Sequence, residues 1–490
     1  MAYRDLRDWL QNVERRGELL KFSGASWKFE MGSMADMLQK QEKHRMPAVL
    51  FDDIPGYPRG FRTLFSMTSS PWRIAHTLGL PEDELECQKL VSNWRRKAKE
   101  LKAIAPKVVK DAPVQENVDT GAAIDLYKFP VPLCHELDGG RYVGTACAMV
   151  QKDPDEGWVN LGTYRGMLVD RDHMGFHAVE AQHGRVIANK YFSRGQAMPI
   201  AVAIGIDPAL YCAASQPMTG WGASEYHFAG GLKGAPLEVF EGLSGLPLPA
   251  SAEIIIEGEC RPGEFVDEGP FGEFHGYYAN LGMKPVKEPL IHVKAVYYRN
   301  NPILTCSSPS IPPHDTSLMG CTLKSMLIWE KLEKLGIPGV RGVWCHEFGA
   351  GWYFNVISIE QMYTGHSRVV GDIAALINTH SGRYTVVVDD DIDPADIDQV
   401  MWAVVTRRRP HEAIEIMSRC PATSTDPAIP LEEKLKYETL PKPMYSSRVV
   451  IDACRPLEHK KDWYPIARVS PELSEDLRSK YPDFFRWKSK

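Results

Sequence analysis

The sequence of 490 residues lacks several patterns that would assign it to a well-marked class of protein. It has no Gly-x-Gly-x-x-Gly between a strand and a helix and no Walker loop, so a nucleotide cofactor would need its phosphate held in another way. Its ten cysteines are scattered, and no two have the Cys-x-x-Cys spacing of a zinc ribbon. This cysteine usage argues against a disulfide scaffold and is typical of a reducing cytosol.

Excess positive charge and long apolar runs are also missing. The net charge of −6 and the pI near 6.2 argue against a dedicated nucleic-acid binder, which is normally basic. No apolar run approaches the roughly 20 residues that span a bilayer. The N-terminus is charged and amphipathic, unlike a signal peptide. We therefore expect a globular, cytoplasmic protein of roughly two to three domains that binds neither nucleic acid nor membrane.

Apolar periodicity predicts a helical beginning followed by a β-rich region. Leu6, Trp9, Leu10 and Val13 recur at helical spacing, and a helical pattern returns over residues 70–105. The predicted strands are residues 48–51, 141–152, 158–170, 198–205, 237–241, 252–258, 290–298 and 303–307. The second and third are joined by a hairpin turn, and so are the last two. These links predict a barrel or sandwich rather than a parallel sheet.

The pattern changes at Thr316, where we place a domain boundary. Apolar residues at helical spacing predict one long helix from Thr316, which Gly336 and Pro338 stop. Beyond it we predict strands at 339–344, 352–357 and 384–388 and helices at 369–377 and 400–406. This alternation is typical of a compact α/β unit. Prolines between residues 421 and 443 then break the chain, and residues 471–487 predict an amphipathic terminal helix.

The stretch Asp267–Tyr278 carries Glu268 and Glu273 among two glycines and a proline. These breakers disfavour a helix, so both carboxylates are expected on a tight loop after a strand. Loops dense in Gly, acid and aromatic residues often hold catalytic groups, although two solvated surface glutamates would give the same pattern. Arg165 supplies a cation that would bind a substrate carboxylate between these acids.

Asn160, His183 and Glu225 offer the oxygen and nitrogen ligands of a hard to borderline cation such as Mn²⁺ or Mg²⁺. Their spacing is long and irregular, so a hydrogen-bonded structural histidine at 183 remains the alternative. Asn160 and Arg165 differ in strand parity, and an ideal strand would point them to opposite faces. A bulge at Gly162 would re-aim one of them.

Three other groups are interpreted as structural. The Cys-His pairs at 134–135 and 345–346 are neighbours that point apart in a strand, so neither predicts a catalytic dyad. The acidic run Asp389–Asp393 would suit a metal, but it better predicts the end of a strand and the cap of the next helix. The basic residues at 95–99 predict a solvated helix face rather than an anion site.

Eight short motifs occur in order along nearly the whole chain. They are Pro113–Asn117, Asp138–Arg141, Asn160–Arg165, Gln182-His183, Ser224-Glu225, Pro249–Gly258, Glu268–Glu273 and Asp389–Thr406. Together they resemble the UbiD family of (de)carboxylases, which use prenylated FMN. The resemblance implies an α+β fold, in which a flavin-reductase-like split β-barrel is joined by a long helix to an α/β oligomerisation domain, with a C-terminal helix reaching across a dimer.

The resemblance also implies domain bounds and site residues. The implied units are a cofactor domain over 1–315 (helical to about 110, split barrel from about 111), a linking helix over 316–336, an oligomerisation domain over 337–440, and a tail with a helix over 441–490. The implied metal ligands are Asn160, His183 and Glu225. The implied catalytic network is Arg165, Glu268 and Glu273.

Cofactor and substrate contacts follow from the same resemblance. The implied cofactor contacts are Asn160, Leu161, Gly162, Thr163, Tyr164, Arg165, Gln182, His183, Gln216 and Arg383. Residues 216–224 depart from the Pro-x-Pro pattern usual in the family. The substrate-side candidates are His314 and Asp315, in a segment that would lie over the substrate. A divalent ion, typically manganese, and a potassium ion would clamp the cofactor phosphate.

The implied activity is reversible, non-oxidative decarboxylation of an aromatic or α,β-unsaturated carboxylic acid, with prenylated FMN as the electron sink. Arg165 would bind the carboxylate, Glu268 would hold Arg165, and Glu273 would supply the proton that replaces CO₂. The implied partners are a second copy of the chain, as a homodimer or higher even homo-oligomer, and a flavin prenyltransferase that supplies the cofactor. Two alternatives are a non-catalytic flavin- or metal-binding subunit and an ordinary flavin oxidoreductase.

Overall fold

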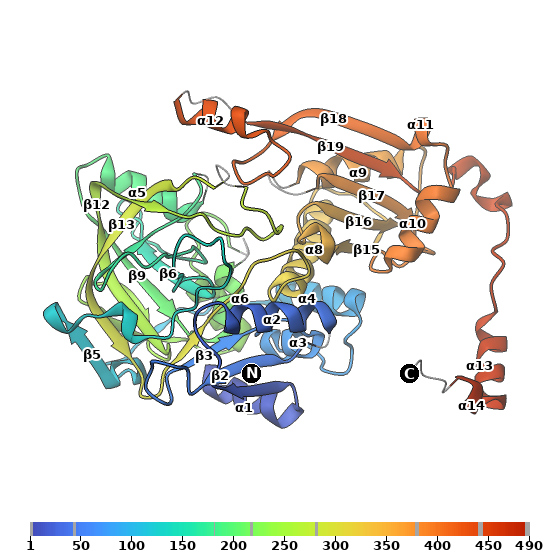
Figure 1. Ribbon diagram of the computed structural model, residues 1–490. Helices are drawn as coiled ribbons and strands as arrows, with labels where there is room; N and C mark the ends of the chain where they lie inside the picture. The colour runs from blue at the N-terminus through green and yellow to red at the C-terminus, as the bar shows by residue number, and fades with distance from the viewer. Residues whose placement is uncertain are drawn as a thin grey trace.

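The computed structural model describes residues 3–42, 46–180, 182–215, 219–279, 283–377, 382–439 and 444–485. It contains two sheet-bearing units joined by the helix α8 (Ser317–Lys334), as predicted (Figure 1). Apolar side chains on most sides of α8 are buried because the helix lies between the two units. Within the described ranges, no helix is both long and apolar enough to cross a bilayer.

The chain begins with the amphipathic helix α1 (Leu6–Arg16), as its apolar spacing predicts. Asp5 caps this helix by accepting a hydrogen bond from the amide of Asp8. Gly17 ends it with a φ of 79°, in the left-handed region that glycine adopts without strain. The apolar face of α1 lies in the main core.

The helical stretch predicted over residues 70–105 is two helices. The first, α3 (Pro71–Leu78), ends at Gly79 in the left-handed region. Pro81 follows, and because proline has no amide hydrogen it cannot continue a helical hydrogen-bond ladder. The second helix, α4 (Cys87–Glu100), therefore starts after a break. The helical pattern predicted over this stretch is therefore divided between two helices.

A four-stranded sheet lies beside these helices and α2 (Glu30–Gln41). Its strands are, in spatial order, β1 (Leu19–Ser23), β2 (Ala48–Asp52), β3 (Arg62–Phe65) and β14 (Ile303–Thr305). We expected β14 to form a hairpin with the strand before it, but it pairs in parallel with β3. Glu253 fixes this crossing, because its carbonyl and its carboxylate accept hydrogen bonds from the amides of Arg299 and Ile303.

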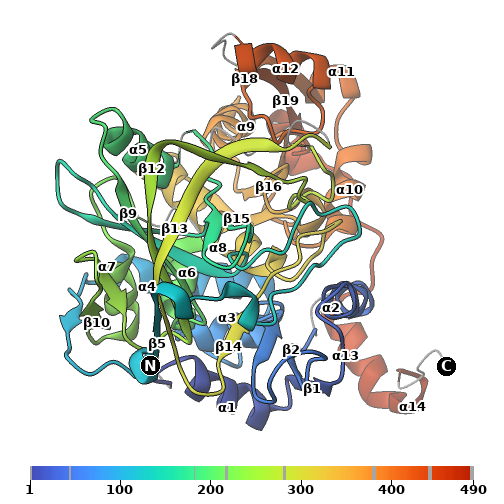
Figure 2. The same cartoon turned by 60° about the vertical axis from the view of Figure 1, so that its left-hand side comes forward.

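The β-rich region forms a seven-stranded antiparallel sheet, with β12 and β13 curving along its length (Figure 2). Its strands are β5 (Asn117–Thr120), β13 (Val286–Tyr298), β12 (Ile254–Glu268), β9 (Met198–Ile204), β6 (Cys147–Lys152) and β7 (Val159–Gly162), with β8 (His173–Gly175) also paired to β13. The predicted hairpin is confirmed, since β6 and β7 pair in antiparallel. Its short helices are α5 (His183–Phe192), α6 (Pro208–Ser215) and α7 (Glu225–Lys233). A separate three-stranded sheet consists of β11 (Pro247–Pro249), β10 (Glu238–Glu241) and β4 (Lys107–Val108).

Strand β12 runs ten residues past the predicted end at Gly258 and finishes at Glu268. Glu268 therefore closes a strand, and only Glu273 lies on the loop that follows. The extension is polar and contains Pro262-Gly263, which sequence reasoning reads as a turn. Pairing with β13 nevertheless continues, and the register shift between Cys260 and Phe265 absorbs these residues.

The C-terminal unit is a five-stranded sheet with helices packed on it. Its strands are, in spatial order, β15 (Val340–Cys345), β16 (Phe354–Ile359), β17 (Tyr384–Asp389), β19 (Tyr445–Asp452) and β18 (Ile414–Pro421). Its helices are α9 (His366–Leu376), α10 (Ile397–Thr406), α11 (Pro410–Ala413) and α12 (Leu431–Thr439). We expected a tail from residue 441, but β19 lies inside this sheet, between β17 and β18. The proline-rich stretch is the connection between these two strands rather than an end of the unit.

The acidic run Asp389–Asp393 is structural, as interpreted from the sequence. Asp389 ends β17 and is fully buried, and its carboxylate forms ion pairs with Arg407, Arg455 and Lys460. Burial alone would raise the pKa of Asp389, but hydrogen bonds from the Arg455 amide and its neighbours outweigh burial and lower the pKa. The cap of α10 comes from Asp396, just beyond the run.

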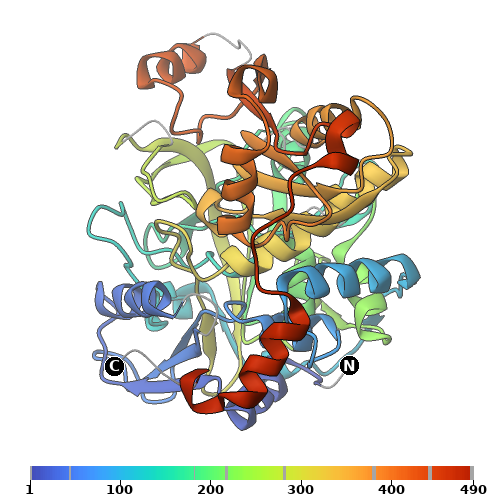
Figure 3. The ribbon, with the colours of Figure 1, turned by 90° about the vertical axis from the view of Figure 1, so that its right-hand side faces the viewer.

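A C-terminal arm leaves the five-stranded sheet and stands off from the rest of the chain (Figures 1 and 3). The predicted single helix is two helices, α13 (Pro471–Lys480) and α14 (Pro482–Phe485), because Pro482 interrupts the ladder. Residues 486–490, which include the predicted end at Trp487, lie outside the described ranges. Both helices lack buried residues in this protomer.

Candidate active site

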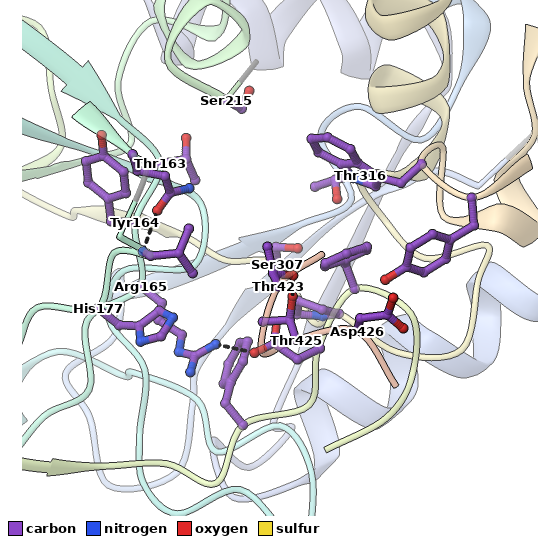
Figure 4. Close-up of a pocket in the computed structure, with 18 of the residues that line it drawn as sticks. Thr163, Tyr164, Arg165, His177, Ser215, Ser307, Thr316, Thr423, Thr425 and Asp426 are labelled. Atoms are coloured by element: carbon purple, nitrogen blue, oxygen red, sulfur yellow. Dashed lines mark hydrogen bonds and ion pairs between the residues drawn. The ribbon is translucent and has the colours of Figure 1, made fainter. Parts of the chain in front are cut away.

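A pocket of about 370 Å³ lies between the seven-stranded antiparallel sheet, which belongs to the predicted split barrel, and the C-terminal unit. Its barrel side carries Arg165, His177 and the loop after β12, and its far side carries Thr423, Thr425 and Asp426 (Figure 4). The floor comes from the segment before α8 and from the start of that helix. Residues far apart in the chain thus form one cavity.

Arg165 reaches the pocket because β7 ends before it. We expected Asn160 and Arg165 on opposite faces, or a bulge at Gly162; instead β7 pairs with β6 without a register shift and stops at Gly162. Arg165 lies beyond the end of the strand, so the alternation of side chains along a strand does not decide where it points. Gly162 is required at this point, because a Cβ there would lie 2.3 Å from the ring of Tyr164.

Arg165 is held by both glutamates that the sequence singles out. Its Nε and Nη2 donate to the two carboxylate oxygens of Glu268 at 2.8 and 2.9 Å, and its Nη1 donates to Glu273 Oε1 at 2.7 Å. The Tyr142 hydroxyl donates to Glu268 Oε1 at 2.8 Å, and the Phe271 ring lies 4.5 Å from the guanidinium carbon. A guanidinium gripped from two sides in this way has one fixed orientation.

The charges of this network are mutually stabilised although the groups are buried. Burial alone would lower the pKa of Arg165, but Glu273 and Glu268 outweigh burial and raise it. Burial alone would raise the pKa of Glu268, but Arg165 outweighs burial and lowers it. Burial and the neighbouring Glu268 raise the pKa of Tyr142, so its hydroxyl remains a donor. Arg165 and Glu268 are therefore a permanent ion pair at neutral pH.

The loop that carries Glu273 is anchored by Asp138. Its Oδ1 accepts hydrogen bonds from the Gly272 amide at 3.3 Å and from the Tyr278 hydroxyl at 3.0 Å. The next amide, of Gly139, donates to the carbonyl of Pro270 at 2.7 Å. A Cβ at Gly139 would lie 2.0 Å from the carbonyl oxygen of Gly269, so only glycine allows this approach. The sequence identified this motif by resemblance but not its contact with the loop.

The two substrate-side candidates differ in position. His314 lines the pocket, but its Nε2 donates to the carbonyl of Phe274 at 3.0 Å and its Nδ1 lies 3.3 Å from the Thr316 hydroxyl. It therefore supports the glutamate loop. Asp315 is not among the lining residues, because its carboxylate accepts hydrogen bonds from the hydroxyl of Ser307 and the amide of Ser308. In this structure Asp315 thus braces the segment before α8, and its contact with substrate stays a prediction.

The three expected metal ligands lie around the end of β7 and the starts of two helices. Asn160 Nδ2 donates to the hydroxyl of Tyr164, which also accepts a hydrogen bond from the amide of Gly184, next to His183. Glu225, the first residue of α7, accepts a hydrogen bond at 2.8 Å from the amide that follows Asn160. These contacts bring the surroundings of Asn160, His183 and Glu225 together.

The protonation and hydrogen bonding of Asn160, His183 and Glu225 favour the binding of a cation. Burial raises the pKa of Glu225, and within the described part of the chain no cationic side chain forms an ion pair with it. Burial lowers the pKa of His183, which favours the neutral imidazole that binds metals. Asn160 uses its amide nitrogen in hydrogen bonds, so its oxygen is the atom left for a ligand. A divalent ion would supply the positive charge that Glu225 otherwise lacks.

The same region has donors without partners that fit a phosphate group. The buried hydroxyls of Thr163 and Ser224 make no hydrogen bond to any described residue. Helices α5 and α7 both begin here, and helix N-termini present free amides and a positive dipole to anions. The residues present therefore fit a phosphate-bearing cofactor held through metal ions.

The remaining expected cofactor contacts are placed as follows. Leu161 is buried and donates its amide to Glu225, and Gln182 precedes α5 and accepts a hydrogen bond from the Val179 amide. Arg383 lines the same pocket, forms an ion pair with Asp426 and stacks its guanidinium carbon 4.4 Å from the Tyr353 ring. Gln216 lies outside the described residues.

The Cys-His pairs are not nucleophilic dyads, as interpreted from the sequence. Burial raises the pKa of Cys134 to about 12 and that of Cys345 to about 11, so both remain thiols at neutral pH. His135 pairs with Asp138, and Nε2 of His346 donates to the carbonyl of Pro394 at 2.9 Å. Neither histidine is engaged with its neighbouring cysteine.

Comparisons with known proteins agree along the chain. The family model described as the 3-octaprenyl-4-hydroxybenzoate carboxy-lyase Rift-related domain matches residues 107–312. The models of the N-terminal and C-terminal domains of the same enzyme match residues 10–90 and 317–453. A pyrrole-2-carboxylic acid decarboxylase from Pseudomonas aeruginosa is 34% identical over 425 residues, which are 83% of each chain.

Solved structures resemble the chain over nearly its full length. The UbiD-class enzyme HmfF from Pelotomaculum thermopropionicum, in complex with FMN, is 26% identical with a TM-score of 0.84, covering 98% of this chain and 100% of that chain. The closed form of vanillic acid decarboxylase from Sedimentibacter hydroxybenzoicus is 26% identical with a TM-score of 0.81, covering 99% and 100%. These matches confirm the α+β fold class. Because three family domains follow one another and a decarboxylase relative spans most of the chain, the protein belongs to the UbiD family and is a carboxy-lyase.

Proposed function

We propose that the protein is a reversible, non-oxidative decarboxylase of an aromatic or heteroaromatic carboxylic acid that uses prenylated FMN. The observation that carries this proposal is the guanidinium of Arg165, gripped by Glu268 and Glu273 inside the pocket between the two units. The decarboxylase relatives named above and the FMN complex of HmfF support it. When bound, the cofactor would supply the electron sink that no side chain offers.

Arg165, Glu268 and Glu273 would each have a different role in the reaction. Arginine has five N–H groups, and Glu268 and Glu273 engage three of them in Arg165, so two are left to bind the substrate carboxylate. Glu268 is fully buried and ionised, and it fixes the guanidinium. Glu273 uses Oε1 for Arg165, and its Oε2 makes no hydrogen bond to another described residue. Oε2 is therefore the atom that would deliver a proton to the carbon that loses CO₂.

Metal ions complete the proposal. Asn160, His183 and Glu225 would hold a divalent cation, with Mn²⁺ as the first candidate, and a K⁺ ion would share the phosphate. The unpartnered hydroxyls of Thr163 and Ser224 would donate to the same phosphate. A flavin prenyltransferase in the cytoplasm would supply the finished cofactor.

Native mass spectrometry of the purified protein, followed by a panel of carboxylic acids, tests the function. We expect a flavin heavier than FMN by a prenyl group and CO₂ release from at least one aromatic acid. Unmodified FMN with turnover that consumes a reduced nicotinamide would make the protein an ordinary flavin oxidoreductase. Bound flavin without any turnover would favour the non-catalytic subunit.

The exposed apolar surface supports an assembly of several copies. On the arm, Tyr464 is 81% exposed and Phe484 is 78% exposed, and the C-terminal unit exposes Trp402 and Val405 on α10 and Ile416 on β18. Side chains of this kind are normally buried in an obligate interface. We expect a homodimer or a higher even oligomer in sedimentation at micromolar concentration. A species near the chain mass of 55.1 kDa would contradict this.

A further inference from the structure

His177 lies against the carboxylate-binding arginine without belonging to its network. The amide of His177 donates to the carbonyl of Arg165 at 3.1 Å, and the two residues form an antiparallel bridge. Residues directly opposite in such a bridge place their side chains on the same face. Both side chains accordingly line the pocket on one side (Figure 4). No motif in the sequence singles out His177.

The ring of His177 is fixed through one nitrogen only. Its Nδ1 lies 2.7 Å from Glu288 Oε1 and 3.8 Å from Glu268 Oε2. Glu288 is buried and is itself held by an ion pair with Arg185, whose Nε donates to the carbonyl of Ala178. Two carboxylates beside Nδ1 keep a hydrogen on that atom. The contacts at Nδ1 thus fix the orientation of the imidazole ring and keep a hydrogen on that nitrogen.

The other nitrogen of His177 is left for a ligand. Nε2 makes no hydrogen bond to any residue in the described ranges. His314, the other histidine of the pocket wall, has both ring nitrogens engaged by Phe274 and Thr316. In an imidazole that carries its hydrogen on Nδ1, Nε2 is an acceptor. When the imidazole is neutral, Nε2 is therefore an acceptor on the pocket wall beside Arg165.

We propose that His177 selects acids whose ring carries an N–H or O–H group next to the carbon that bears the carboxylate. This inference rests on the proposed function and names its substrate class. Arg165 binds the carboxylate, and Glu268 Oε2 contacts both the guanidinium at 2.9 Å and the imidazole at 3.8 Å. A donor one atom from the carboxyl-bearing carbon would then reach Nε2. A ring oxygen at that position would instead face the lone pair of Nε2 and be rejected.

Pyrrole-2-carboxylate and furan-2-carboxylate form a matched pair, because they differ mainly in the ring N–H. We expect calorimetric titration of the protein as purified to show about 10- to 100-fold tighter binding of the pyrrole acid. In His177→Phe, which keeps a flat ring but removes the acceptor, the ratio should fall to near one. His177→Gln restores an acceptor oxygen and should recover part of the preference. Glu288→Gln, which no longer fixes the tautomer, should reduce it.

His173→Phe is the control, because His173 lies on β8 outside the pocket wall and should leave the ratio unchanged. Equal binding of both acids by the wild type, or an unchanged ratio in His177→Phe, would overturn the proposal. Since the readout is binding, a protein that discriminates the acids but releases no CO₂ would contradict the proposed function and leave the role of His177 intact. Release of CO₂ from both acids, with equal binding of the two, would support the proposed function and contradict the role of His177.

Discussion

Glu273→Gln is expected to lower the rate of decarboxylation by about 10²- to 10⁴-fold, with the cofactor content unchanged. Glutamine keeps the volume of the side chain and an acceptor for Arg165 Nη1, but it has no proton to give. The network around Arg165 therefore stays in place while the proton transfer is lost. Single-turnover measurement of CO₂ release from an accepted acid checks the size of the loss.

Asp267→Asn is the matched control for this variant. Asp267 precedes Glu268, is exposed, and among the described residues forms an ion pair only with Lys287 at the surface, so its charge should not affect the rate. Exchange of labelled CO₂ with the substrate needs no new proton and should survive in Glu273→Gln. Near-normal turnover in Glu273→Gln would remove Glu273 from the role of acid, and Glu268 or a water would have to take it.

Glu225→Gln should remove both the metal and the flavin from the purified protein. The amide oxygen still accepts from the Leu161 amide, and the NH₂ group can donate to the Thr219 hydroxyl, so local folding is preserved. It has no negative charge, however, and the phosphate would lose the cation that neutralises it. Because ligand-supporting changes already cost about 10–100-fold in metal affinity, loss of a charged ligand should exceed this.

Metal analysis and the flavin absorbance of the purified variant provide the measurement. Glu238→Gln on β10 is the control, since this side chain is exposed and takes no part in the hydrogen bonds that Glu225 accepts from Leu161 and Thr219. Wild-type amounts of both metal and flavin in Glu225→Gln would contradict the proposal that Glu225 binds the metal ion at the cofactor phosphate. Loss of flavin with retained metal would instead show that the ion is held by other residues.

The main groups of the site were accessible from sequence because each stands in a local motif. Arg165 lies 103 residues from Glu268 and 108 from Glu273, yet the structure brings the three into hydrogen-bond contact. Local sequence patterns cannot predict contacts between residues so far apart in the chain. The ordered motifs that resemble one family did predict them. The long helix α8 and the β6–β7 hairpin were predicted because their signals lie within one stretch of chain.

What was missed depends on contacts between distant segments. β19 looks like a tail because prolines precede it, and its place in the sheet comes from pairing with β17 and β18. The end of β12 looks like a turn because it contains Pro-Gly, and pairing with β13 overrides that preference. His177 and Thr425 carry no motif at all. The bridge with Arg165 places His177 in the pocket, and the C-terminal unit brings Thr425 to it.

The pocket wall is divided between two parts of the chain, and this division bears on how the enzyme's specificity can evolve. Arg165 and Glu273 belong to the barrel side, whereas Thr423, Thr425 and Asp426 come from the connection between β18 and β19. That connection carries none of the groups that hold Arg165, and it meets the glutamate loop through a hydrogen bond from His275 Nε2 to the carbonyl of Thr425 at 2.8 Å. New substrates can therefore be acquired through side-chain replacements at Thr423 and Thr425, which leave this backbone contact and the groups around Arg165 in place.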